Sequence, residues 1–214
     1  MLGVRRCRSA ASLEPLGMTT RRVAWRRSGE IESDEHCTLM LRASWLSLIG
    51  TILGAEGGLP VRVEYRVLAD SDGLTRAVHV RDLRGFEQRT LALARDARGG
   101  WTVNGVPAPP LKGCSDVDLG CSPSTNTLPV RRLRLGFAAK HTIQAALVRF
   151  PDLSVHKVPQ TYTRLDEFTY RYASGTFETE LVVDDDGLVI QYAEWLRTAD
   201  ATGPEDTEPL DARR

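Results

Sequence analysis

The sequence predicts a mainly β protein, and three observations support this fold class. At least ten short segments alternate apolar and polar residues, clusters of glycine, asparagine and aspartate separate them, and helical periodicity is nearly absent. The chain has 214 residues, 42% of them hydrophobic, which suffices for one sizeable core and is short for two. Because so many strands leave exposed sheet edges unless the sheet curls or closes, we expect one curled sheet.

The predicted folded domain spans residues 21–198, between two segments that we expect to be disordered. Residues 1–20 begin with basic and polar positions and contain no continuous apolar run, and we expect Met18 to be the natural start. Residues 199–214 are polar and acidic and contain proline. Within the domain, the first strands are predicted over residues 23–25, 35–42, 43–55, 61–67, 75–83, 86–94 and 101–103.

A second group of short strands follows at near-regular spacing. Three prolines at 107, 109 and 110 disfavour regular pairing before this group. Asp70 to Gly73 and Asp184 to Gly187 are typical of hairpin turns, and the latter lacks the spaced ligands of a calcium-binding EF-hand loop. The strands of this group are predicted over residues 143–150, 154–158, 161–165, 168–172, 177–183 and 188–192.

Charge and cysteine content argue against several functional classes. The 28 basic and 28 acidic residues balance, so no global field favours a nucleic-acid partner. No run approaches the ~18 apolar residues that a membrane-spanning helix needs. The four cysteines lack the spacing of a zinc or redox motif. We therefore expect reduced thiols in the cytoplasm, no metal and no cofactor.

The densest chemistry lies in a central segment, residues 113–133, which reads GCSDVDLGCSPSTNTLPVRRL. The single helix is predicted here, because Val130 and Leu133 would share one face and Pro129 is tolerated in a first turn. Its N-terminal cap is expected from a hydroxyl side chain, namely Ser124, Thr125 or Thr127.

Asp116 and Asp118 are the first candidates for acid/base chemistry. Alternation in a strand places both carboxylates on one face, where the pKa of one could be raised and a proton shared. The alternative is structural: the two aspartates pair with Arg131, Arg132 or Arg134 and cap backbone groups. We favour the structural interpretation, because buried charges generally persist only when they are paired.

Other catalytic arrangements have weaker support in the sequence. A nucleophile elbow, a phosphate-binding glycine loop and a zincin helix are all absent from it. Cys114 or Cys121 could meet a histidine in space, from position 36, 79, 141 or 156, but the spacing does not predict such a pair. The aromatic residues are candidates either for ligand contact or for core packing, namely Trp25, Trp45, Trp101, Trp195, Tyr162, Tyr170, Tyr172 and Tyr192.

The central segment resembles the signature of a known family. Cys114-Ser-Asp-Val-Asp-Leu119, followed by Ser122-Pro-x-Thr-Asn-Thr-Leu-Pro-Val-Arg-Arg-Leu133, is similar to the motif of the putative glycolipid-binding family, a domain of unknown function. Gln160-x-Tyr162 and Tyr170-Arg-Tyr172 also match, and the resemblance covers residues 21–197, with Ala193 where the family pattern has proline.

The resemblance implies a fold and a class of ligand. The fold is a spiral β-roll, a long antiparallel sheet wrapped around a single short α-helix, reported as a homodimer and similar in shape to the lipoprotein carriers LolA and LolB. The implied function is non-enzymatic binding or transport of a glycolipid or acyl lipid, with apolar walls and a polar mouth.

Three functional hypotheses therefore remain open at the level of sequence. The first is a lipid or glycolipid carrier, the second an enzyme that uses Asp116 and Asp118 on a lipid-like or sugar substrate, and the third an interaction protein without a ligand. Residues expected to bind a ligand, or to form a structural polar network, are Asp116, Asp118, Thr125, Asn126, Arg131 and Arg132.

Overall fold

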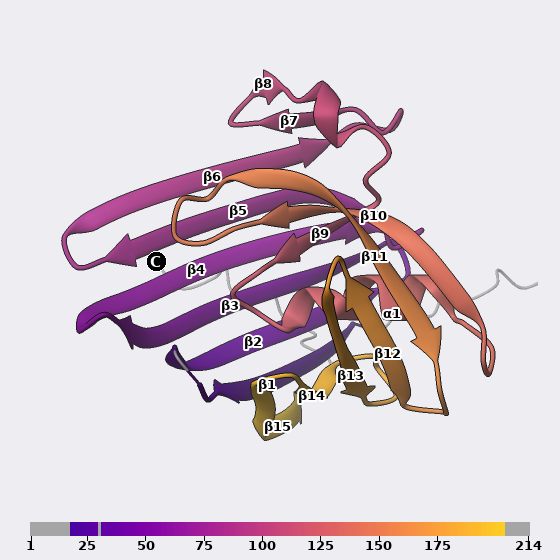
Figure 1. Ribbon diagram of the computed structural model, residues 1–214. Coiled ribbons are helices and arrows are strands. Elements are labelled where there is room, and N and C mark those ends of the chain that lie inside the picture. Colours follow the sequence, from indigo (N-terminus) through magenta and orange to yellow (C-terminus); the bar gives the residue numbers. More distant parts are fainter. Residues whose placement is uncertain (1–17, 30, 204–214) are drawn as a thin grey trace, which may run out of the picture.

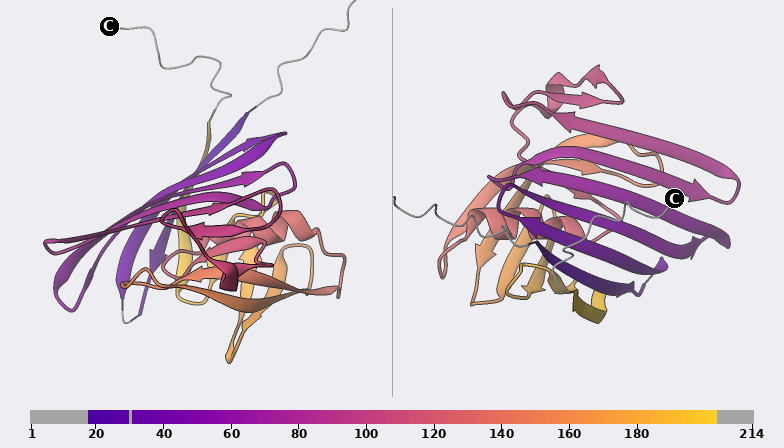
Figure 2. Two further views of the ribbon diagram at one scale, coloured as in Figure 1. Left: turned by 90° about the horizontal axis from the view of Figure 1, so that it is seen from above. Right: turned by 180° about the vertical axis from the view of Figure 1, so that it is seen from behind.

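One continuous sheet dominates the computed structural model, which describes residues 18–29 and 31–203. Fifteen strands follow the order β8-β7-β6-β5-β4-β3-β2-β1-β15-β14-β13-β12-β11-β10-β9. The sheet folds over on itself into two leaves, β1–β8 and β9–β15, with the helix α1 between them (Figures 1 and 2). This arrangement confirms the predicted curled sheet around one short helix.

The first leaf consists of long hairpins whose alternate side chains face inward. On the inner face, cross-strand neighbours form rows, one of which runs through Trp25, Glu35, Ile52, Val63 and Asp82. Its strands are β1 (Thr19–Arg27), β2 (Glu32–Arg42), β3 (Trp45–Glu56), β4 (Leu59–Asp70), β5 (Thr75–Arg84), β6 (Glu87–Arg95), β7 (Trp101–Val103) and β8 (Val106–Pro107).

The central segment lies inside the roll. A 3-10 turn η1 (Pro109–Leu111) precedes it, and it contains β9 (Asp116–Leu119), η2 (Ser124–Asn126) and α1 (Thr127–Leu133). Pro129 lies in the first turn of α1, as expected, and the helix ends at Arg134, which has a left-handed φ of 44°. The expected hydroxyl cap was wrong, because the N-cap residue is Asn126. Its side chain does not cap the helix, since its Oδ1 accepts from the Tyr162 hydroxyl.

The second leaf returns the chain to its beginning. β9 pairs parallel with β10, so the expectation of a wholly antiparallel sheet was wrong at this pair. The two strands can run parallel because the segment between them, which contains α1, carries the chain back as a crossover connection. The strands of this leaf are β10 (Lys140–Val148), β11 (Val155–Arg164), β12 (Thr169–Ser174), β13 (Phe177–Val183), β14 (Val189–Tyr192) and β15 (Trp195–Gly203).

Several predicted boundaries differ from the structure. The separate strands expected over 154–158 and 161–165 are one strand, β11, because Pro159 lies where β11 pairs only with β10; pairing with β12 begins at Thr161. Ala199 to Gly203 belong to β15 and pair with β1, so backbone pairing overrides their polar composition. The predicted disorder of residues 1–20 was wrong at Thr19 and Thr20, which belong to β1 and pair with β2. The rest of the predicted tail, and residues 1–17 of the predicted extension, lie outside the described residues.

The roll has two different ends. At one end, α1 finishes beside the turn after β4, where Asp70 Oδ1 accepts from the backbone N–H groups of Asp72 (2.9 Å) and Leu74 (3.0 Å). At the other, here called the open end, the β3–β4 and β5–β6 hairpin tips project beyond the inner elements (Figure 1). Arg89 Nη1 donates to Pro151 O at 2.9 Å and so joins β6 to the β10–β11 turn. Among the described residues, no helix is long and apolar enough to cross a membrane.

Candidate functional site at the open end of the roll

Asp116 forms the ion pair that the sequence predicted. The residue is 1% exposed, and Arg132 Nη2 donates to its Oδ2 and also to Ser115 Oγ (3.2 Å). Burial raises the pKa of Asp116 above its ordinary value, although the Arg132 charge and the Ser115 hydroxyl oppose this shift. The predicted pairing of Asp116 with an arginine of the helix is therefore confirmed.

Asp118 has a different partner from the one expected. Gln160 Nε2, from β11, donates to Asp118 Oδ2 at 2.6 Å, and no arginine pairs with this carboxyl in the part of the chain that the structure describes. The expected arginine pairing was wrong for Asp118, because the side chain of Arg131 instead reaches the β13–β14 turn. Burial raises the pKa of Asp118 to about 6, against the hydrogen bonds from Gln160 and Thr125.

The remaining predicted site residues also bond within the protein. Thr125 Oγ1 accepts from the Leu119 N–H (3.2 Å), and Asn126 Oδ1 accepts from the Tyr162 hydroxyl (2.9 Å). Arg131 Nη1 donates to Asp186 O at 2.6 Å. The six predicted residues thus bond within the central segment or to the second leaf, and their role in ligand binding stays a prediction.

A second polar group, which the sequence analysis missed, surrounds Glu35 on β2. Glu35 is 3% exposed; its Oε1 accepts from the hydroxyls of Tyr65 and Ser122 (2.7 Å from Ser122 Oγ), and Tyr65 also lies 2.8 Å from Ser124 Oγ. Burial raises the pKa of Glu35 to about 7, despite these hydrogen bonds. The alternation of residues in β2 could have predicted this burial, because Glu35 lies two residues before Cys37 and four before Leu39 and so shares their inward face.

Gly50 makes room for this group. A Cβ atom built on Gly50 would lie 2.2 Å from the Tyr65 ring carbon Cζ, so only glycine lets the ring cross β3 toward Glu35. We expect Gly50→Ala to lower the free energy of unfolding by about 1–3 kcal/mol through overpacking. Urea denaturation would measure this loss. Gly136→Ala is the matched control, since a Cβ there meets nothing within 4 Å, and equal stability of both variants would contradict the prediction.

Asp82 on β5 is a second buried carboxyl of the same inner row. It is 2% exposed; Arg84 Nε donates to its Oδ2 at 2.9 Å, and burial raises its pKa to about 6. Glu35 Oε2 and Asp82 Oδ1 are buried without a hydrogen-bond partner among the described residues, and so is Asp116 Oδ1 in the central segment. Ile52 and Val63 separate the two carboxyls across the sheet.

A cavity of about 330 Å³ lies at the open end, where Ile52 and Val63 of this row line it and the two carboxyls do not. Its walls come from both leaves and from Gly120 and Cys121 of the central segment. Apolar side chains form much of the lining, and charged side chains stand among them; the lining includes Ile52, Val61, Val63, Leu147, Phe150, Arg27, Arg84, Arg149 and Glu56. Hollows of about 580 and 490 Å³ lie on the outer face of the first leaf, where neighbouring strands of one layer supply nearly all of the walls. Two others, of about 520 and 380 Å³, lie beside α1; Arg131 lines both and Arg132 lines the larger.

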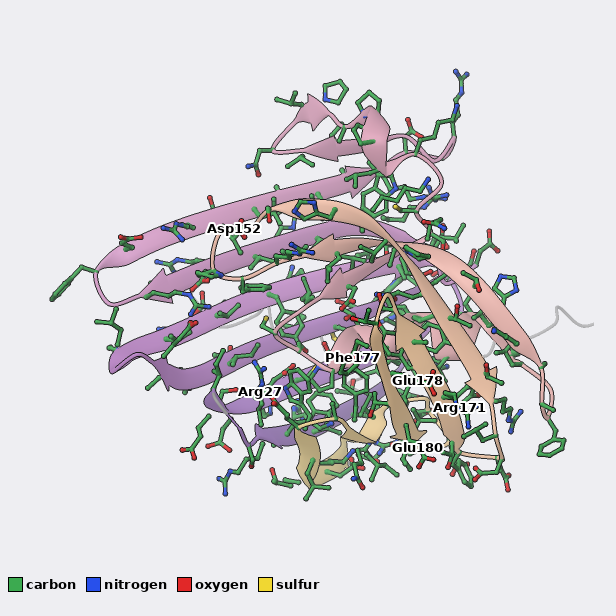
Figure 3. All side chains as sticks on the ribbon, in the orientation of Figure 1. Arg27, Asp152, Arg171, Phe177, Glu178 and Glu180 are labelled. Carbon is green, nitrogen blue, oxygen red and sulfur yellow. The ribbon has the colours of Figure 1, made fainter. Side chains whose placement is uncertain are left out.

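The cavity's arginines differ in how they are paired. Arg27 Nε donates to Glu194 Oε2 at 2.8 Å, and Arg84 pairs with Glu56 as well as with Asp82. Arg149 has no acidic partner in the described ranges. The Arg27 guanidinium also lies 4.6 Å from the ring centroid of Trp195. The Trp195 ring stacks on Tyr192, and Tyr192 contacts Phe177, so aromatic rings connect Arg27 to Phe177 (both labelled in Figure 3).

Thiol chemistry and metal binding find no support at this site. Burial, together with the charges of Glu35 and Asp82, raises the pKa of the Cys121 thiol well above its ordinary value, so the thiol stays protonated at neutral pH. All four histidines are exposed, and none of them forms a cysteine–histidine pair in residues 18–29 and 31–203. The same residues contain no cluster of three or more metal-ligating side chains.

Comparison with known proteins points to one family. Residues 22–198 match the model of a family described as putative glycolipid-binding. A crystal structure of a DUF1089 family protein from Pseudomonas aeruginosa is similar to this chain, with a TM-score of 0.66 and 32% sequence identity. The alignment covers 88% of this chain and 96% of the Pseudomonas chain. No curated protein matches the sequence.

Proposed function

Because the chain belongs to the putative glycolipid-binding family, we propose that it binds a glycolipid or a similar amphipathic lipid in the open-end cavity. The observation that carries this proposal is the cavity itself, which joins apolar walls to charged side chains in one space of about 330 Å³. Ligand sites commonly combine an apolar lining with a few placed polar groups. The role is binding or carriage, without catalysis by the chain.

The enzymatic alternative has less support from the geometry. Asp116 is buried and paired with Arg132, whereas Asp118 is bonded to Gln160, so the two carboxyls do not present a shared proton to an open cleft. A glycosidase pair instead flanks its substrate at separations of about 5–9.5 Å. Neither carboxyl lines the open-end cavity.

Native mass spectrometry would test this proposal, followed by solvent extraction and lipid analysis. We expect the purified protein to carry, or to take up, close to one equivalent of an amphipathic lipid. Val61→Trp should fill the cavity and reduce uptake at least tenfold, because Val61 lines it. Leu53→Trp is the matched control, since Leu53 is 56% exposed and does not line the cavity. A protein without lipid that also refuses offered glycolipids and acyl lipids would contradict the proposal.

Homodimer formation and a cytoplasmic location belong to the same proposal. The outer face of β3–β6 supplies a surface for self-association, because it carries two broad hollows with exposed apolar side chains such as Leu68. Light scattering of the purified chain and cell fractionation would measure the two properties.

A further inference from the structure

We propose that the cavity of about 520 Å³ beside α1, here called the arginine cavity, binds a phosphate ester. It lies at the end of the roll where α1 finishes, away from the hairpin tips of the open end (Figure 1). The arginine cavity and the open-end cavity share no lining residue, so this inference does not rest on the proposed function. The ligand class is a monoester whose phosphate contacts arginine side chains and whose organic part lies on apolar ones.

Two hairpin ends and the helix bring the walls of the arginine cavity together. Arg42 pairs with Trp45 where β2 meets β3, and Trp45 pairs with Asp70 at the end of β4. The turn after β4 packs closely on α1, since a Cβ atom built on Gly73 would lie 3.0 Å from Arg132 Cβ. Regular elements therefore support the lining, and such elements position a site more accurately than long loops do.

The lining of the arginine cavity contains more positive than negative side chains. Four arginines and two aspartates line it, namely Arg42, Arg131, Arg132, Arg134, Asp70 and Asp72. The neighbouring cavity of about 380 Å³ is balanced, because three arginines and three acidic residues line it. A cleft lined mainly by one sign of charge attracts ligands of the opposite sign, so an anion is expected in the larger cavity.

Two of the four arginines are free to contact a ligand. Arg131 and Arg132 already contact aspartates of the protein. Arg42 and Arg134 are exposed and have no acidic partner within residues 18–29 and 31–203. The Arg42 guanidinium lies 5.8 Å from the ring centroid of Trp45, a contact that leaves its N–H groups available. Arg42 and Arg134 are therefore the residues that we assign to the phosphate.

The two aspartates of the lining do not neutralise both arginines. Asp70 Oδ1 accepts from backbone N–H groups of its own turn, and its Oδ2 accepts from Arg76 Nε at 2.6 Å. Asp72 is exposed and forms no ion pair in the described part of the chain. The charges that remain unpaired in the lining are thus two arginines and one aspartate, which leaves the cavity positive.

A phosphate monoester matches this lining better than a carboxylate does. The monoester carries about −1.5 to −2 charges at neutral pH and three strong acceptor oxygens, enough for two guanidinium groups at once. A carboxylate has two oxygens, which one arginine can occupy in a bidentate pair. Leu46 and Leu128 are buried apolar residues of the same lining and supply a surface for the organic part of an ester, which inorganic phosphate would leave uncovered.

Titration calorimetry with phenyl phosphate tests the arginine cavity, with benzyl alcohol as the uncharged partner. We expect phenyl phosphate to bind the wild-type protein at least tenfold more tightly than benzyl alcohol. Salt at about 1 M should weaken this binding, because it screens exposed charges. In nitrogen-15 NMR, the Gly73 amide and the Trp45 indole should shift on addition of phenyl phosphate, whereas the Gly120 amide of the open-end cavity should not.

Arginine variants locate the phosphate. Arg42→Gln and Arg134→Gln should each weaken phenyl phosphate binding at least threefold, and the double variant at least tenfold. Arg98→Gln is the matched control, since Arg98 is exposed in the turn between β6 and β7 and does not line the arginine cavity. All three arginines are exposed, so we expect each variant to fold, which urea denaturation would check. Equal binding by the double variant and the wild type would overturn the proposed site.

Vesicles separate a lipid phosphate from a soluble one. Sedimentation with phosphatidylcholine vesicles that contain phosphatidic acid, absent for pure phosphatidylcholine and lost in the double variant, would assign the phosphate to a lipid head group. Binding of phenyl phosphate without such sedimentation would assign it to a soluble ester. Absence of arginine-dependent binding to both probes would overturn the site and leave the lipid proposal for the open end unchanged.

Discussion

Replacing Glu35 by glutamine is expected to raise the stability of the protein at pH 8 by about 3 kcal/mol. The pKa of Glu35 is about 7 in the folded protein and 4.5 for an ordinary glutamate, and each unit corresponds to about 1.36 kcal/mol. Between these values the folded state binds more protons than the unfolded state, so stability is lost as the pH rises from about 4.5 through 7. Glutamine keeps the acceptor for Ser122 and Tyr65 but cannot ionise.

Urea denaturation at pH 5 and pH 8 measures this effect. We expect the wild type to lose stability between these pH values relative to Glu35→Gln, while the control Glu32→Gln, at an exposed position of the same strand, follows the wild type. The same difference in stability between Glu35→Gln and the wild type at both pH values would show that folding does not raise the pKa of Glu35 in this range.

Asp116→Ala is expected to destabilise the fold by about 3–5 kcal/mol. Removing one partner of a buried ion pair leaves the other charge uncompensated, and here Arg132 would lose the carboxylate that orients it against the central segment. Asp118→Ala is a useful comparison, because it removes a hydrogen bond from Gln160 but no ion pair, and its cost should be smaller.

Chemical denaturation of Asp116→Ala, Arg132→Ala and the double variant gives the coupling between the two side chains. Each single substitution should lower the free energy of unfolding of the wild type by more than the second substitution lowers that of a single variant. Unchanged unfolding of Asp116→Ala, together with lost lipid binding, would instead assign Asp116 to the ligand site.

The fold followed from sequence more fully than the site did. The alternation of apolar and polar residues locates strands such as 61–67 and 75–83, because each strand has one buried face. The helix could be placed in the central segment because the alternation stops there. The Asp116–Arg132 pair was also within reach, since both residues lie in one short segment. Glu35 and Asp82 were not predicted to lie in one inward-facing row, because they are 47 positions apart and only the register of four strands aligns them.

The pairing of β1 with β15 has a consequence for how the chain reaches its native state. Thr20 lies opposite Gly203, so the first and last described strands are neighbours although nearly the whole sequence separates them. During synthesis, the edge of β1 stays without its partner until the final strand leaves the ribosome, and the entropy of closing so long a loop slows folding. A nascent roll therefore exposes its inner face, including Trp25, to other chains during this interval. Once β15 docks, the same contact places both ends of the domain together, which is the geometry that tolerates circular permutation.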